Sequence, residues 1–230
     1  MSFLNDVVNI VIKYYPNLLD GVGNTMLIAL IGTVAGLVIG LLTGVVRTAP
    51  LSKNAVLRVL HKILNAVIAV YVEIFRGTPM MVQLLIMSMV IFSNSRNFTM
   101  VGALTLGINS GAYVSEIIRG GLMAVDPGQM EAGRSLGLNY MTTMVVIIIP
   151  QAIRAVLPAL GNEFIVLLKD TSLITVIGGK ELLYAAQGIM NRTYEAMFPL
   201  LGVALIYLIL VMLFTWLLSK FERRLAQSDR

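Results

Sequence analysis

The sequence has no cysteine and only one histidine, His61, among its 230 residues. The lack of cysteine excludes disulfides, thiolate metal sites and a thiol nucleophile. A single histidine has no second histidine with which to form a metal site, so we interpret His61 as part of a basic face. Charge is also scarce, since 13% of the residues are charged and 57% are hydrophobic. This composition argues against a soluble globular protein.

The common motifs of catalysis are missing as well. The sequence contains no G-x-x-x-x-G-K-[ST], so the chain by itself should not bind ATP through a P-loop. The nearest fragment, residues 178–181 (GGKE), lacks both the upstream glycine and the hydroxyl residue. H-E-x-x-H does not occur either. We therefore expect no enzyme, and no metal or cofactor bound by this chain.

What the sequence does contain is long apolar runs, and about 20 such residues cross a bilayer. We predict an all-α integral membrane protein with about five transmembrane helices in one domain over residues 1–230. The expected spans are residues 25–46, 64–92, 100–118, 153–168 and 197–218. Residues 3–15 mix apolar and polar residues and are too short to span, which favours an interfacial helix. We see no removable signal peptide.

Basic residues predict the orientation of the chain in the membrane. They gather after the first expected span and in the C-terminal tail, whereas the loop after the second span offers only Arg96. Cytoplasmic loops of membrane proteins collect lysine and arginine. We therefore expect the N-terminus outside and the C-terminus in the cytoplasm. The net charge of +5 has this explanation and does not require a nucleic-acid partner.

Small residues recur every four positions on two of the expected spans. This spacing lets helix backbones approach closely in lipid, so we predict helix packing faces there. The residues concerned are Gly32, Gly36, Gly40 and Gly44 on the first span, and Ala103, Gly107, Gly111 and Ser115 on the third. No internal repeat is visible.

A polar, glycine-marked stretch at residues 131–150 (EAGRSLGLNYMTTMVVIIIP) interrupts this apolar chain. Its pattern is E-A-G-x-x-x-G, then nine residues, then I-x-I-P. It resembles the EAA loop of bacterial ABC-importer permeases, from which it departs at Gly133, where the family has alanine, and at Ile149, where it has leucine. Residues 73–83, 109–121 and 167–173 look like further signatures of the polar amino acid subfamily (histidine, glutamine and arginine systems).

This resemblance implies a type I ABC importer permease in a bacterial inner membrane. The loop would dock as a helix on a cytoplasmic ATPase, which binds the ATP and magnesium, and would carry its movement into the membrane. Glu131 and Arg134 share a helix face and can form charge-assisted bonds there. The implied coupling residues are Glu131, Ala132, Gly133, Arg134 and Gly137. The implied partners are a second permease chain, two ATPases and an extracytoplasmic amino-acid-binding protein. We favour a homodimer, because this chain carries both a docking loop and candidate substrate residues.

Ionisable residues inside spans are costly and are functional candidates. Glu163, Lys169 and Asp170 are the deepest, and Thr171 and Ser172 suggest a new helix start that would attract a substrate carboxylate. The full set of candidate substrate residues is Glu163, Asp170, Lys169, Asn162, Thr171, Ser172, Gly111 and Tyr113. Two carboxylates with one nearby lysine predict a basic amino acid, arginine above all.

Several alternatives remain open at this point. Glutamine is the main alternative substrate within the family. An ion-coupled secondary transporter could use Glu163 and Asp170 for ions, although such a carrier has no need of a docking loop. Lys169 could simply neutralise one carboxylate, and Tyr113 could be an ordinary core aromatic. Two pairs three residues apart, Glu116 with Arg119 and Glu73 with Arg76, look like structural ion pairs, although the family signature leaves a gating role open for Glu73 and Arg76.

Overall fold

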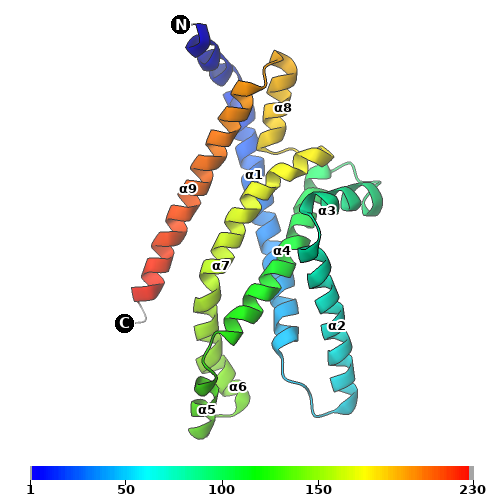
Figure 1. The fold of residues 1–230 in the computed structure, drawn as a ribbon, viewed down its shortest axis with the longest axis vertical. Helices are drawn as coiled ribbons and strands as arrows, with labels where there is room; N and C mark the ends of the chain where they lie inside the picture. Colours follow the sequence, from blue (N-terminus) through cyan, green and yellow to red (C-terminus); the bar gives the residue numbers. More distant parts are fainter. Residues whose placement is uncertain (1, 228–230) are drawn as a thin grey trace. The chain divides into compact units, whose positions relative to one another are not determined.

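The protein is described by a computed structural model that covers residues 2–227, with side chains over residues 12–225. All regular elements in this range are helical, which confirms the predicted all-α class. The α-helices are α1 (Ser2–Thr48), α2 (Ala55–Gly77), α3 (Met80–Ile86), α4 (Phe98–Met123), α5 (Pro127–Ser135), α6 (Tyr140–Thr143), α7 (Ile149–Asp170), α8 (Leu182–Thr193) and α9 (Met197–Gln227) (Figure 1). Two π-helical segments, η1 (Met87–Ile91) and η2 (Met144–Ile148), and a 3-10 segment, η3 (Thr171–Ile177), extend them.

Four helical stretches of the described chain are long and apolar enough to cross a membrane. They are Ile12–Thr48, Ala55–Gly77, Tyr140–Ile177 and Met197–Leu225. The fifth long helix, α4, has 26 residues and carries polar side chains such as Asn109 and Ser110. The prediction of five spans counts α4 as the fifth span, although α4 does not stand out as a span by apolarity alone.

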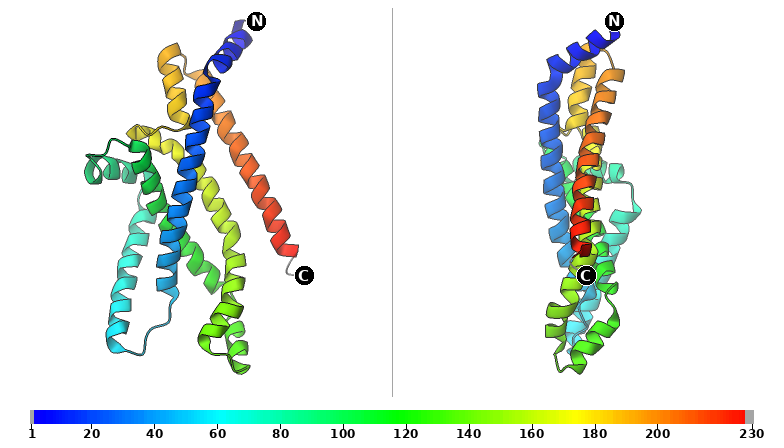
Figure 2. Two further views of the ribbon diagram at one scale, coloured as in Figure 1. Left: turned by 180° about the vertical axis from the view of Figure 1, so that it is seen from behind. Right: turned by 90° about the vertical axis from the view of Figure 1, so that its left-hand side faces the viewer.

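The chain before the first expected span differs from the prediction. Residues 3–15 are helical, but they are part of the continuous helix α1 and not a separate element. Figure 2 shows the dark-blue start of α1 turned away from the helix that follows. α1 contains Pro16, and a proline inside a helix removes a hydrogen bond and bends the helix. The position of residues 3–15 along a membrane surface stays a prediction.

The expected second span, residues 64–92, is not one helix. α2 ends at Gly77, and Thr78 is extended, with φ −119° and ψ 149°. Pro79 follows and precedes α3. The break has a local cause, because a residue before proline is disfavoured in helical conformation. The prediction was wrong because the apolar run was followed across this proline.

By its contacts the chain forms two compact units, and each is discontinuous in sequence. Unit 1 comprises the chain up to Thr33, Pro79–Gly107 and Phe164–Leu217. Unit 2 comprises Val34–Thr78, Ile108–Glu163 and the chain from Leu218. In unit 1, the buried residues Leu182, Ala186 and Val203 form an apolar cluster. In unit 2, the corresponding cluster contains Ile68, Val72 and Ala112.

The predicted small-residue faces are packing faces. In unit 2, a Cβ added at Gly36 would lie 2.7 Å from Ser110 Oγ, and one at Gly40 would lie 2.4 Å from Val114 Cγ1. Only glycine therefore allows α1 to lie this close to α4. In unit 1, a Cβ at Gly32 would be in ordinary contact with Leu106, at 3.5 Å. These faces are thus used within one chain.

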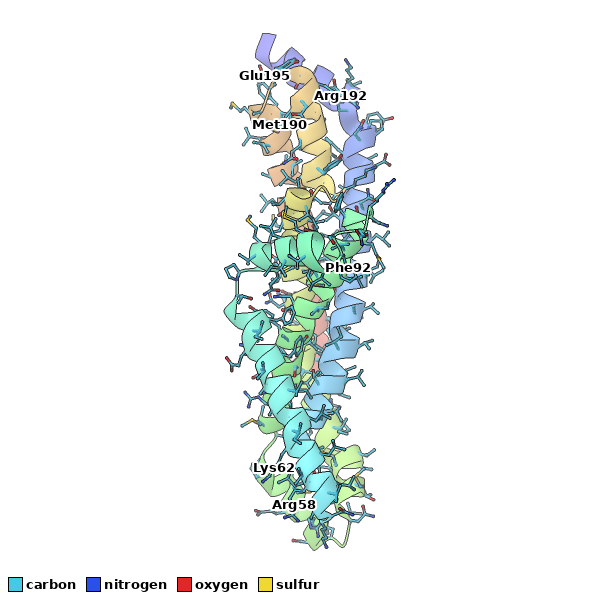
Figure 3. All side chains as sticks on the ribbon, turned by 90° about the vertical axis from the view of Figure 1, so that its right-hand side faces the viewer. Arg58, Lys62, Phe92, Met190, Arg192 and Glu195 are labelled. Atoms are coloured by element: carbon cyan, nitrogen blue, oxygen red, sulfur yellow. The ribbon has the colours of Figure 1, made fainter. Side chains whose placement is uncertain are left out.

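The first half of α2 presents basic side chains. Figure 3 shows Arg58 and Lys62 at this end of the helix. Asn54 caps the helix by accepting a hydrogen bond from the Val56 N–H at 2.9 Å. The Arg58 guanidinium bonds to the carbonyl oxygens of Ser52 and Lys53, at 3.1 and 3.2 Å. The predicted basic face therefore has a defined local structure.

Candidate functional site

The helix expected in the EAA-like loop is α5. Asp126 caps it by accepting a hydrogen bond from the Gly128 N–H at 2.8 Å, and Pro127 takes the first helical position. The helix ends in a Schellman motif, in which the Gly137 N–H donates to Arg134 O at 3.0 Å and the Leu138 N–H donates to Gly133 O at 3.1 Å. Gly137 has φ +83°, a left-handed conformation that favours glycine. Gly137 thus ends the helix, as predicted.

One side of α5 packs on the chain that follows it, and the other side is exposed. A Cβ at Gly133 would lie 2.6 Å from Thr143 Cγ2 and 3.3 Å from Ile147 Cδ1. The missing side chain therefore lets α5 rest on α6 and η2, beside which it lies in Figure 1. The exposed residues of this segment include Glu131, Ala132, Arg134, Leu136 and Gly137. Among them, Leu136 is 81% exposed.

Glu163 forms the polar centre of unit 2. It lies on α7, and its Oε1 accepts a hydrogen bond from the Ser110 hydroxyl of α4 at 2.9 Å. Ser110 is buried and Glu163 is half-buried, whereas the neighbouring Asn162 is exposed. A carboxylate within an apolar helix is expensive to insert, which makes it a functional candidate. The sequence identified Glu163 and did not identify Ser110 as its partner.

Tyr113 lies one helical turn further along α4, and its side chain is 38% exposed. The Arg76 guanidinium lies over this ring, 5.3 Å from its centroid, in a cation–π contact. The predicted ion pair between Glu73 and Arg76 is wrong for the described chain, because Arg76 Nη1 instead approaches Glu116 Oε2, at 4.0 Å. A tertiary contact has replaced the contact that helical spacing suggested.

Gly111 is a packing residue. A Cβ at this position would lie 2.7 Å from Ile39 Cγ2 and 2.8 Å from Tyr71 Oη. Protein atoms therefore fill the space beside Gly111, and its place among the candidate substrate residues stays a prediction.

Glu116 is surrounded by three arginines in unit 2. Arg119 donates to Glu116 Oε2 from Nη2 at 2.7 Å and from Nε at 3.0 Å, which confirms the predicted pair. Arg47 donates to Glu116 Oε1 from the end of α1. With Arg76 at 4.0 Å, three cations face one carboxylate. This group carries more positive than negative charge.

The remaining predicted substrate residues belong to unit 1. Lys169 is exposed and Asp170 half-buried at the end of α7, and neither forms an ion pair within the described residues. The predicted helix start at Thr171 and Ser172 is wrong, because α7 continues into η3 without a break. The hydroxyl of Thr171 donates to Leu168 O, and that of Ser172 donates to Lys169 O, both at 2.8 Å. These hydroxyls bond back along the helix and create no free N–H groups for a carboxylate.

The next α-helix is α8, which begins at Leu182 and has Glu181 as its N-cap. This side chain is 1% exposed and accepts hydrogen bonds from the N–H groups of Leu183 and Tyr184, at 2.8 and 2.7 Å. It also accepts from the hydroxyls of Thr175 and, at 2.7 Å, Tyr207. All four acceptor positions of the carboxylate are therefore filled. Sequence reasoning missed Glu181, whose only local signal is its position just before an apolar helical run.

Unit 1 also contains an open cavity of about 510 Å³. α1 contributes Asn17, Asp20 and Asn24 to its lining, and the segment around α8 contributes Lys180 and Arg192 among others. Figure 3 shows Arg192 near the end of α8, with Met190 and Glu195. The lining carries charges of both signs.

These features define a multi-span helical membrane protein with a glycine-terminated helix on a polar loop. Comparison with known proteins also indicates a membrane protein of this kind. The model of the family "Binding-protein-dependent transport system inner membrane component" matches residues 36–227, and the chain belongs to this family. The glutamine transport system permease protein GlnP of Escherichia coli K12 is 38% identical over 214 residues, which cover 91% of this chain and 93% of that one.

Solved structures give the same fold. A chain in a structure titled as an amino acid ABC transporter with histidines superposes with a TM-score of 0.82 at 39% identity, covering 93% of this chain and 96% of that one. The MetNI methionine ABC transporter, in an inward-facing form, superposes with a TM-score of 0.70 at 21% identity, covering 90% of this chain and 95% of the neighbour. The second match supports the fold alone. The resemblance found in the EAA-like loop is thereby confirmed.

The chain is accordingly a multi-pass inner-membrane permease of the ABC importers for amino acids, with the type I fold. Permeases of this class act with a separate ATPase and a substrate-binding protein. ATP is used by the partner ATPase and not by the permease.

Proposed function

We propose that this chain carries a polar amino acid with an uncharged side chain across the membrane, and that glutamine is its first candidate substrate. The observation that carries the proposal is the Glu163 carboxylate, held by Ser110 at 2.9 Å inside unit 2. A carboxylate at this depth can bind the ammonium group that every amino acid carries. The name of the Escherichia coli relative, at 38% identity along almost the whole chain, supports glutamine.

A basic amino acid is the second candidate. It is supported by the 39% identical structure whose title mentions histidines. The sequence favoured a basic substrate because Lys169 was the only cation expected near the carboxylates of Glu163 and Asp170. Arg76, over the ring of Tyr113, adds a cation to unit 2, to which Glu163 also belongs. The deficit of positive charge that favoured arginine as substrate is therefore smaller than the sequence suggested.

The exposed side of α5 would be the contact with the ATPase. Gly133 and Gly137 fix the shape of this helix, and Glu131 and Arg134 are exposed for charge-assisted bonds with a partner. The exposed Leu136 would bury its apolar surface in that contact. ATP and magnesium would be bound by the ATPase, and its movement would pass from α5 through α6 into α7.

The complete importer would contain two copies of this chain and two ATPases, with an amino-acid-binding protein outside. We place the N-terminus outside and the C-terminus in the cytoplasm, because the tail and the loop before α2 are basic. In this orientation the cavity lined by Asp20, Lys180 and Arg192 opens to the outside, where a binding protein would release its amino acid.

The test is uptake by the complete importer in liposomes, with the binding protein outside and ATP inside. Labelled glutamine is offered in competition with arginine, lysine, histidine and glutamate. We expect ATP-dependent glutamine uptake that unlabelled glutamine suppresses best. Stronger suppression by the three basic amino acids would establish the second candidate. A preference for glutamate, or uptake without ATP, would overturn the proposal.

A further inference from the structure

Among the three arginines around Glu116, Arg76 is the one whose N–H groups form no hydrogen bond with this carboxylate. Arg119 grips Glu116 with two bonds, and Arg47 binds the other carboxylate oxygen. Arg76 comes only to 4.0 Å, and its side chain is 43% exposed. A distance of 4.0 Å is too long for a hydrogen bond. The guanidinium of Arg76 is therefore charged, accessible and weakly paired.

This guanidinium is held in a defined place. The Asn109 side chain donates to Phe75 O at 2.9 Å, directly before Arg76, and the Tyr71 hydroxyl donates to Ile108 O at 2.6 Å. These two bonds fix the last turn of α2 against α4. The Arg76 guanidinium then lies over the Tyr113 ring, 5.3 Å from its centroid. A cation–π contact of this kind uses the charge of the guanidinium and does not use up its N–H donors.

The residues that contact Arg76 and Glu163 are also neighbours along α4. Ser110, which binds Glu163, and Tyr113, which supports Arg76, are three residues apart on one helix. Three residues of an α-helix rise by about 4.5 Å. The α4 residues that contact a negative group, Glu163, and a positive group, Arg76, thus lie roughly one helical turn apart in unit 2, an arrangement that suits the ammonium and the carboxylate of one amino acid.

We propose that Arg76 binds the α-carboxylate of the transported amino acid while Glu163 binds its ammonium group. This inference rests on the proposed function and adds the residue that recognises the carboxylate. Arginine is suited to this task, because its planar fork matches a carboxylate with two parallel bonds. Both charges of the amino acid are then paired, and the side chain that fits best is polar and uncharged.

The experiment compares two ligands that differ only in the carboxylate. Binding of glutamine and of glutamine amide, in which a carboxamide replaces the α-carboxylate, is measured on the assembled permease–ATPase complex in nanodiscs. The wild type should prefer glutamine by about 10- to 100-fold, the range expected for hydrogen bonds to a charged group. Arg76→Gln should bind both ligands about equally. Arg58→Gln, which removes another exposed arginine of α2, should keep the full preference.

A second variant covers the case in which Arg76→Gln does not assemble. Arg76→Lys keeps the charge but loses the fork, so its preference for glutamine should fall several-fold while the ATPase still copurifies. An unchanged preference in both Arg76 variants overturns the inference, and it leaves the proposed function intact if glutamine still binds. If loss of binding instead follows the anionic lipid content of the nanodisc, Arg76 binds a lipid headgroup, and the inference is wrong. If the wild type binds no amino acid, the proposed function itself fails.

Discussion

An alanine side chain at position 133 would clash with Thr143, and the size of this clash gives a quantitative prediction. The added Cβ would lie 2.6 Å from Thr143 Cγ2 and 3.0 Å from Thr143 Oγ1. Thr143 is fully buried and β-branched, so it has little freedom to turn aside. Overpacking of this kind costs about 1–3 kcal/mol. Replacing glycine by alanine within a helix recovers roughly 1 kcal/mol. Gly133→Ala should therefore destabilise the packing of α5 on α6 by about 0–2 kcal/mol, although it restores the alanine of the family pattern.

The matched change is Thr143→Ala, which removes the clashing atoms. It removes the buried methyl group and a hydroxyl bond to Asn139 O, at 3.0 Å within the same turn, and the Cβ added at residue 133 takes up part of the space. The double variant should therefore be at least as stable as the wild type, with a coupling energy of about 1–3 kcal/mol between the two positions. Hydrogen exchange of the α5 amides in the assembled importer measures this energy, and the amount of ATP used per transported amino acid reports its effect on coupling. Additive effects, within about 0.5 kcal/mol, would refute this account of Gly133.

Three further predictions follow from single residues. Gly137→Val places a β-branched residue at φ +83°; it should cost about 1–2 kcal/mol and lower uptake per ATP hydrolysed, and wild-type coupling would contradict the role given to this turn. Glu181→Ala leaves several buried donors without an acceptor; it should lower the free energy of unfolding of the detergent-solubilised protein by about 3–5 kcal/mol, whereas an unchanged melting temperature would mean that the buried network adds nothing. Gly40→Ala should lower the melting temperature, because its Cβ would lie 2.4 Å from a side-chain atom of Val114. The control Gly23→Ala has no atom within 4 Å and should be neutral or stabilising, so equal effects of the two changes would contradict this reasoning.

The sequence predicted those features that depend on composition and on short-range spacing. The membrane class follows from apolar length, and the end of α5 at Gly137 follows from a local glycine signal. The contact of Arg76 with Tyr113 and Glu116 depends on the approach of α2 to α4, which spacing within α2 does not reveal. The same limit hid Glu181, because two of its partners, Thr175 and Tyr207, become neighbours only when η3 and α9 pack together.

The helix start predicted at Thr171 and Ser172 failed for a different reason. Serine and threonine favour helix starts, but their hydroxyls also bond to carbonyls three or four residues back within a continuing helix. The structure takes this second option, with both hydroxyls bonded to residues three positions earlier. Residue type alone does not separate these outcomes.

The division of the two units along the chain has a consequence for biosynthesis. Most of unit 2 is available once residue 163 has been made, whereas unit 1 needs residues up to Leu217. Its buried Thr25 accepts a hydrogen bond at 3.1 Å from the Leu182 N–H, 157 residues further on. At about 5–20 residues per second, the ribosome needs roughly 8–30 seconds to make this partner. During that time the start of the nascent chain lacks this partner, so lipid or the insertion machinery has to shelter it from proteolytic quality control.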